Sequence, residues 1–443
     1  MKKIIVGLLA LCPIAAFGQT DSLAPAKVLT LDQAIQVALS ENVSVKVADM
    51  EIKRTDYAKK GTYASLFPSI DLSGSFQRTI KKQKMYMDVP GMEDGLEVGR
   101  WNTWSTGVTA AMPLVNAQLW RSIKISGQDV ELAVEKARSS RIETVTQVKQ
   151  TFFAVLLAKE ACNVYRSVYE NAVENFEQTQ KKYNAQRASE LDLTRAKTTL
   201  ANAIPNLYDS ESSIVLTLWQ LKAVIGLDLE TDIDVVGNLD DYADEMFRAI
   251  HENDDATPEN NSSLRQLAIQ AEELANMIKL QQAAYLPTLA LSFSYSLNAM
   301  TNDFKFSEYN WSPYSFVGLS LQIPIFSGGK RASNVKQAKI QYDELKLQEM
   351  DAERQLKIAI RQYLNQMETQ MKSYSAAQDA MTTAQKAYDI ASKSYSIGRS
   401  TLTDLNDAQL ALTQAELSLC QTVYNFMIAK TNLEQTLGND FLE

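Results

Sequence analysis

The residue types that carry catalytic or metal chemistry are scarce and scattered in this sequence. It contains one histidine, His251, and three cysteines, Cys12, Cys162 and Cys420, which lie far apart and form no paired motif. One histidine leaves little basis for a histidine-ligated metal or a catalytic triad. No glycine-rich phosphate-binding loop is present, and acidic residues spread along helices are usually solvated. We therefore expect no enzyme activity, no metal site and no cofactor.

The most regular polar pattern is a pair of aspartates that each follow a hydroxyl residue by three positions. Ser189 precedes Asp192 in this way, and Thr401 precedes Asp404. The spacing is typical of a capping box, with Asp in place of Glu, which stabilises the first turn of a helix. Asp407, one turn later, is not explained by capping. If copies of the chain surround one axis, such carboxylates form rings that attract cations, so both interpretations stay open.

These aspartates lie at corresponding places in two copies of one unit. Several similar segments recur in the same order and at nearly one offset, which chance rarely produces. The recurring pairs are Leu66-Phe67-Pro68 with Tyr285-Leu286-Pro287, Met112-Pro113-Leu114 with Ile323-Pro324-Ile325, Lys182-Tyr183-Asn184 with Ser394-Tyr395-Ser396, and Ile225-Gly226 with Leu437-Gly438. We assign 19–226 to a first repeat, 227–261 to an acidic equatorial linker, 262–438 to a second repeat and 439–443 to a C-terminal tail.

Each repeat is predicted to contain a helix, two strands and then two long helices. The first helices begin near Thr30 and Ser262, and each meets a proline that ends the helix and introduces a strand. Residues 116–183 and 329–395 are almost free of Gly and Pro, and helices of that length extend on the order of 100 Å. Heptad-spaced leucines in the helices that follow indicate coiled-coil packing, and Pro205 is expected to interrupt one of them.

The strand segments alternate apolar with small polar residues, as Leu289, Leu291 and Phe293 do with their neighbours. They are expected at about 69–80, 101–115, 288–298 and 311–325. Alternation gives one apolar and one polar face, which suits a membrane barrel and equally a half-buried soluble sheet. Four strands are too few for a barrel in lipid, where unpaired edges are costly. In a membrane, therefore, several chains must pool their strands. Two chains would supply eight, with an interior filled by side chains, and three would supply twelve, with room for a lumen.

The N-terminal segment has the features of a secretory signal peptide. Lys2 and Lys3 precede a short apolar stretch, and Ala16 and Gly18 fit a cleavage site, so we expect 1–18 to be removed. The formal net charge of −9 argues against a nucleic-acid partner. After the leader, the sequence has no apolar run long enough for a transmembrane helix.

The sequence resembles the TolC-type outer-membrane channels of tripartite efflux and type I secretion systems over nearly all of the mature chain. The matching motifs are Leu29-Thr30-Leu31-Asp32, Pro324-Ile325-Phe326-Ser327-Gly328-Gly329 and, most specifically, Tyr395-Ser396-Ile397-Gly398-Arg399-Ser400-Thr401. The resemblance implies an α+β membrane protein built as a homotrimer. Its twelve-stranded β-barrel would lie in the outer membrane of a diderm bacterium, continued by a twelve-helix periplasmic α-barrel.

The same resemblance implies the function and the partners. The channel would be the exit duct for substrates delivered by an inner-membrane pump of RND or ABC type through a periplasmic adaptor, with outer-membrane lipid around its barrel. The alternative is a periplasmic coiled-coil or adaptor protein without its own pore, which the duplicated strand pairs argue against. The cargo, the pump type and the lipidation of Cys12 stay open at this point.

The family also implies a periplasmic gate in the second-repeat turn. Asp404 and Asp407 match the aspartates that ring the closed tip, while Tyr395 and Asp192 match residues that hold the helix pairs together. Arg399 lies one position before the place of the family's basic residue, so this latch is expected to be rewired. Gly398 is expected to supply the backbone conformation of the turn. In the first repeat, Gln186 stands where glycine is usual.

Overall fold

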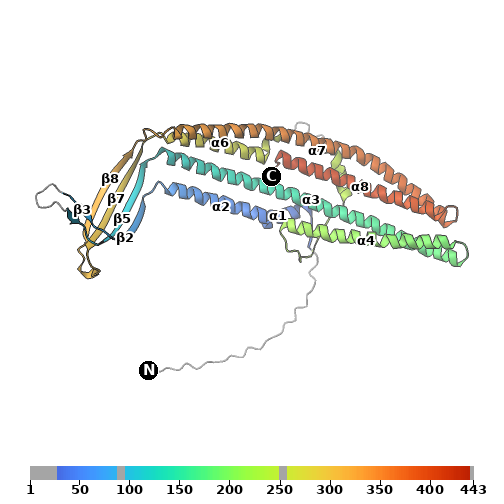
Figure 1. The fold of residues 1–443 in the computed structure, drawn as a ribbon. Helices are drawn as coiled ribbons and strands as arrows, with labels where there is room; N and C mark the ends of the chain where they lie inside the picture. Colours follow the sequence, from blue (N-terminus) through green and yellow to red (C-terminus); the bar gives the residue numbers. More distant parts are fainter. Residues whose placement is uncertain (1–26, 87–94, 249–256, 440–443) are drawn as a thin grey trace, which may run out of the picture.

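The computed structural model describes residues 27–86, 95–248 and 257–439. The protein is a long curved rod, with a four-stranded sheet at one end and the turns of two helical hairpins at the other (Figure 1). The expected leader 1–18 lies outside the described residues, as do His251 and all but the first residue of the expected tail. No helix in the described ranges is long and apolar enough to cross a bilayer.

The sheet contains one antiparallel strand pair from each repeat. Its strands are β2 (Ser69–Arg78), β5 (Asn102–Val115), β7 (Thr288–Thr301) and β8 (Ser312–Gln322). The order is β2-β5-β7-β8, so the two repeats join through β5 and β7, where Val108 lies opposite Tyr295. The register shifts after Pro113, as expected for a residue without a backbone N–H. Within the described ranges, β2 and β8 each pair with a single strand of this sheet.

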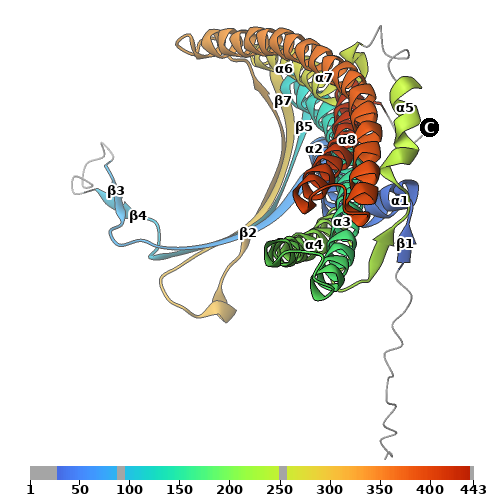
Figure 2. The same cartoon turned by 90° about the vertical axis from the view of Figure 1, so that its right-hand side faces the viewer.

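Smaller elements lie at the end of the sheet away from the helices. A two-stranded sheet of β3 (Gln83–Met85) and β4 (Leu96–Val98) projects sideways beyond β2 (Figure 2). A short 3₁₀ helix, η3 (Phe306–Glu308), connects β7 to β8. Its Phe306 stacks edge-on against Trp104 at 4.7 Å between ring centroids. The sequence pattern had not predicted these elements, because each is only three residues long.

The helices continue the lateral order of the strands. They are α1 (Leu31–Glu41), α2 (Val43–Ala64), α3 (Ala117–Asn184), α4 (Glu190–Ile225), α6 (Ser262–Ala283), α7 (Lys330–Ser396) and α8 (Leu402–Leu437). Near the sheet α2, α3, α6 and α7 lie side by side, and farther away α3 pairs with α4 and α7 with α8 (Figure 1). The predicted duplication is confirmed. The expected interruption at Pro205 is wrong, since α4 continues through it.

The main hydrophobic core lies near the middle of the rod, where the acidic segment packs on the helices. Parallel strands β1 (Lys27–Leu29) and β6 (Ile233–Val235) pair there, followed by η1 (Leu239–Tyr242), α5 (Ala243–Arg248) and η2 (Pro258–Asn260). Leu239 and Met246 are fully buried with Phe152 and Phe426. Lys159 on α3 donates to the carbonyl of Val235 at 2.8 Å. The described part of the segment is thus packed into the body through apolar contacts, although the sequence is acidic.

An asparagine cap and a glycine meet at the same place in both repeats. Asn42 caps α2 by accepting from Ser44 N, and its side-chain N–H donates to the carbonyl of Val224 at 2.7 Å. Asn261 caps α6 and donates to the carbonyl of Thr436 at 2.8 Å. Two residues after each accepting carbonyl, a glycine with positive φ ends the long helix: Gly226 at +78° and Gly438 at +72°. This paired junction ties the end of each hairpin to the start of a short helix.

We predict that Gly438→Ala destabilises the protein by about 2 kcal/mol or more, because a Cβ would collide with the Asn260 carbonyl and the positive φ strains any other residue. Thermal unfolding followed by circular dichroism measures the effect. Gly127→Ala within α3 is the control, since a Cβ there meets nothing within 4 Å and alanine favours a helix by about 0.5–1 kcal/mol. Equal melting temperatures for the two variants would contradict this account of the junction.

Candidate functional site at the helical tip

The turns that close the two hairpins have the same backbone conformation. Gly398 has φ +77°, and Gln186 at the corresponding place has φ +57°, the one non-glycine with positive φ among the described residues. In each turn the N–H of this residue donates to the carbonyl three positions earlier, at 3.1 Å and 2.8 Å respectively. Gly398 therefore supplies the positive φ that the turn requires, as expected. In the first repeat Gln186 adopts the same conformation, at the cost of backbone strain.

Asp192 and Asp404 are both members of capping boxes. The Asp404 carboxylate accepts from the Thr401 hydroxyl at 2.7 Å and from its N–H at 2.8 Å, and the Asp404 N–H donates back to the Thr401 hydroxyl. Asp192 accepts from the hydroxyl of Ser189 in the same way, at 2.7 Å. The hydrogen bond from the Thr401 hydroxyl, then that from its N–H, holds the pKa of Asp404 below its ordinary value. Both aspartates thus have a structural role at the start of a helix.

Tyr395 joins the two hairpins within one chain. Its hydroxyl lies 2.6 Å from the hydroxyl of Thr179 on α3, and the Lys182 ammonium donates to its carbonyl at 2.9 Å. The same ammonium lies over the Tyr395 ring, 4.2 Å from the centroid. Tyr395 is buried with Leu402, Leu405 and other apolar residues of the tip. Sequence reasoning missed the roles of Thr179 and Lys182 because their contacts with Tyr395 join residues more than 200 positions apart and leave no local pattern.

The remaining expected residues are not all brought together. Asp192 lines the same pocket as Tyr395, but its carboxylate is held by Ser189, and no hydrogen bond joins it to Tyr395 within the described part of the chain. Arg399 and Asp407 are exposed, and neither side chain has a hydrogen-bond or ion-pair partner among the described residues. The two hairpins are also linked by weaker bonds between α4 and α8, from Arg195 to Thr403 and from Asn406 to Thr199.

The structure is therefore a duplicated unit with two hairpin turns at one end and, at the other, a sheet whose two edges are unpaired among the described residues. Sequence comparison shows which family this chain belongs to. The family model described as outer membrane efflux protein matches residues 34–227 and 255–439, most of the chain. The chain belongs to this family. Among its curated relatives, TolC of Escherichia coli K12 is 21% identical over 345 residues, which cover 76% of this chain and 70% of that protein. TolC of Vibrio cholerae is 20% identical, covering 75% and 76% respectively.

Solved structures share the fold of this efflux protein. The CmeC outer membrane channel of Campylobacter jejuni matches with a TM-score of 0.73 at 19% identity, covering 92% of this chain and 85% of that one. VceC of Vibrio cholerae matches with a TM-score of 0.72 at 16% identity, covering 93% and 96%. The expected family, mixed helix and strand fold, outer-membrane location and efflux-channel function are confirmed by these matches. The family comprises channels and not enzymes.

We predict opposite effects of glycine substitutions in the two tip turns. Gln186→Gly stabilises the protein by about 1 kcal/mol, because glycine adopts a positive φ without the steric strain that glutamine bears there. Gly398→Ala destabilises it by a similar amount, through backbone strain alone, since a Cβ there meets nothing within 4 Å. Unfolding midpoints in denaturant measure both changes. A lower midpoint for Gln186→Gly would show that the glutamine side chain contributes a contact that outweighs the strain.

Proposed function

We propose that three copies of this efflux protein close into one duct, a twelve-stranded barrel in the outer membrane continued by a twelve-helix tunnel in the periplasm. The observation that carries the proposal is the pair of open sheet edges, β2 and β8. In hydrocarbon each unpaired N–H or C=O costs several kcal/mol. Pairing β8 of one copy with β2 of the next removes every edge, and three chains of four strands give a barrel wide enough for a lumen.

The outer helices support the same closure. On α2 an apolar stripe runs along one face at spacings of three, four and seven, comprising Val43, Val47, Met50 and Tyr57. On α7 a comparable stripe comprises Ile340, Leu347, Met350 and Ile358. Each of these side chains is more than half exposed in the single chain. Because α2 and α7 are the two outermost helices beside the sheet, closing the ring brings one stripe against the other and buries both.

In this proposal the duct receives substrates from an inner-membrane pump of RND or ABC type through a periplasmic adaptor protein. The TolC relatives and the long helical body support a role in a tripartite efflux pump or a type I secretion system. A rod or adaptor without a pore would not require a sheet with exposed apolar side chains and two unpaired edges. The division into a leader, two repeats, an equatorial linker and a tail is part of the same proposal.

The trimer is tested by adding charge to the α7 stripe. Leu347→Glu should shift the purified protein in detergent from heat-dissociable trimer to monomer, because each interface loses about 1.5–3 kcal/mol of apolar burial. Gln348→Glu, the exposed neighbour on the same helix, adds the same charge without removing apolar surface and should leave the trimer intact. Electrophoresis without heating and light scattering measure the assembly. A wild-type protein that is a folded monomer in water without detergent would refute the proposal.

The tip forms the gate in this duct, with Tyr395 and its Thr179 and Lys182 contacts holding the two hairpins of each chain in the closed arrangement. Three-fold symmetry then places Asp404 and Asp407 around a narrow aperture, where carboxylates concentrate cations. Asp192 stabilises the neighbouring helix start, and Arg399 is free to reach an adjacent copy. Asp407 is exposed and has no polar partner among the described residues, so it is better suited to line the aperture than Asp404, whose carboxylate caps a helix.

We predict that the closed channel prefers cations and that Asp404→Asn with Asp407→Asn reduces this preference severalfold in planar bilayers, measured as the reversal potential in a salt gradient. Asp407→Asn alone is the sharper variant because it leaves the capping box intact. Since the pKa of Asp404 is lowered, its share of the preference should persist on acidification below the pH at which an ordinary aspartate is protonated. Unchanged selectivity in both variants would remove these residues from the gate.

A further inference from the structure

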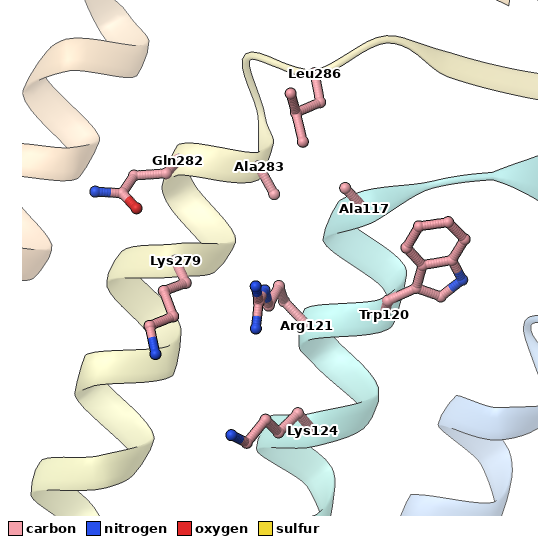
Figure 3. Close-up of a pocket in the computed structure, with 8 residues that line it drawn as sticks. All are labelled: Ala117, Trp120, Arg121, Lys124, Lys279, Gln282, Ala283 and Leu286. Carbon is pink, nitrogen blue, oxygen red and sulfur yellow. The ribbon is translucent and has the colours of Figure 1, made fainter.

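A basic pocket lies where the helices meet the sheet, in the groove between α3 and α6. It has a volume of about 450 Å³ and is lined by Ala117, Trp120, Arg121, Lys124, Lys279, Gln282, Ala283 and Leu286. Figure 3 shows Arg121 and Lys124 on α3 pointing toward α6, where Lys279 lies along the helix and lines the same pocket. The pocket is complete within one chain and lies far from the tip. Neither the fold nor the proposed gate requires it.

The three cations of this pocket have no structural role in the described part of the protein. None of them forms an ion pair or a side-chain hydrogen bond with a described residue. Arg121 and Lys124 lie near the N-terminus of α3, where the helix dipole offers cations no stabilisation. Three like charges in one groove repel each other, which disfavours folding. Their presence therefore points to an anion that binds between them.

The first repeat provides an internal comparison. Lys60 occupies the place that corresponds to Lys279, eight residues before the helix-ending proline in each case. Lys60 is neutralised by an ion pair with Asp56 at 2.7 Å and lies over the Tyr57 ring. The place of Asp56 is taken by Ala275 in the second repeat, so Lys279 keeps its charge unpaired. A basic residue at this place is common to both repeats, but only the second leaves it available to a ligand.

The pocket is polar at one end and apolar at the other. Leu286 and Ala117 lie nearest the strands, whereas Lys124 and Lys279 lie farther along the helices (Figure 3). Trp120, half exposed, lies on the side of α3 away from α6, between the levels of Ala117 and Lys124 (Figure 3), and indole rings favour a membrane interface. The order from strand to helix is therefore apolar, aromatic and cationic. This order matches a phospholipid whose acyl chains run along the sheet and whose phosphate lies toward the periplasm.

The pocket also lies on the side of the body that can face lipid. With the sheet end uppermost, the helix colours run in opposite orders in Figures 1 and 3, so Figure 3 views the pocket from the side that lies at the back of Figure 1. Lys159 binds Val235 and Asp234 of the β1–β6 segment. Figure 2 shows β1 and α5 on the convex side of the curved layer. On a closed ring, that side is the exterior.

We infer that this pocket binds the headgroup phosphate of an anionic glycerophospholipid in the periplasmic leaflet of the outer membrane. The inference rests on the proposed closed barrel in that membrane. Arg121, Lys124 and Lys279 hold the phosphate, and Leu286 contacts the acyl chains. Basic pockets between helices at a membrane surface bind acidic lipids by this chemistry. A trimer carries three such sites, each locking α3 to α6 at the base of the barrel.

The test measures binding of phosphatidylglycerol to the purified trimer in nonionic detergent by native mass spectrometry. The triple variant Arg121→Gln, Lys124→Gln and Lys279→Gln should bind on the order of a hundredfold more weakly, since each cation near an anionic headgroup contributes about fivefold. Lys279→Gln alone should weaken phosphatidylglycerol binding about fivefold. This single variant replaces the triple variant in the test if the triple variant does not fold. Lys60→Gln, the matched control, should bind as the wild type does.

Two further ligands distinguish a site for an anionic lipid from a site for any lipid or any phosphate. Phosphatidylcholine and inorganic phosphate should each bind the wild type at least tenfold more weakly than phosphatidylglycerol. Equal binding of phosphatidylcholine, equal binding of inorganic phosphate, or equal loss in Lys60→Gln would each overturn the inference. Conductance in planar bilayers is recorded for every variant. A wild type that neither trimerises nor conducts refutes the proposed function, whereas a conducting trimer with unaltered lipid binding in Lys279→Gln and the triple variant refutes only the lipid site.

Discussion

The backbone hydrogen bonds of the four-stranded sheet set the conditions for the rest of the molecule. Within the described residues β2 and β8 each leave one edge without a partner, and hydrocarbon offers no water to replace it. A single chain therefore cannot be a stable unit in the membrane. The helices inherit this condition, because α2, α3, α6 and α7 continue the strand order and their outermost members carry the exposed apolar stripes. In the proposed trimer the sheet edges and the helix stripes both pack against the same neighbour, a second copy of the chain.

The two repeats share one backbone architecture but differ in side chains at corresponding positions, as duplication followed by divergence would produce. The backbone requirements are met in both repeats: two asparagine caps, two helix-ending glycines, two capping boxes and two turns with a positive φ. The side chains that are free to differ do so. Gln186 replaces glycine at one turn, and Ala275 replaces the acidic partner that neutralises Lys60 in the first repeat.

At the tip, the hydrogen-bond partners of a residue indicate whether it stabilises its own helix or links the two hairpins. Asp192 and Asp404 are held by the hydroxyl residues that begin their helices, which accounts for both without a gate. Tyr395 instead connects elements from the two repeats, through Thr179 and Lys182, so its bonds break if the hairpins separate. A link of this kind between two rigid hairpins is what an opening motion would change. Asp407 and Arg399 are exposed tip residues whose side chains have no polar partner among the residues that the structure describes.

The sequence by itself determined the elements whose signals are local or repeated: the duplication, the long helices, the four amphipathic strands, the capping boxes and the turn at Gly398. Helical and strand periodicity and capping depend on neighbours within a few residues, so they are readable from order alone. Only the tertiary structure decided the pairing of β1 with β6, the Asn42 and Asn261 junctions, and the contact of Tyr395 with Thr179, and only it placed Arg121 and Lys279 in the lining of one pocket. Those contacts join residues far apart in the chain, and side-chain bonds of that range leave no periodic trace in a single sequence.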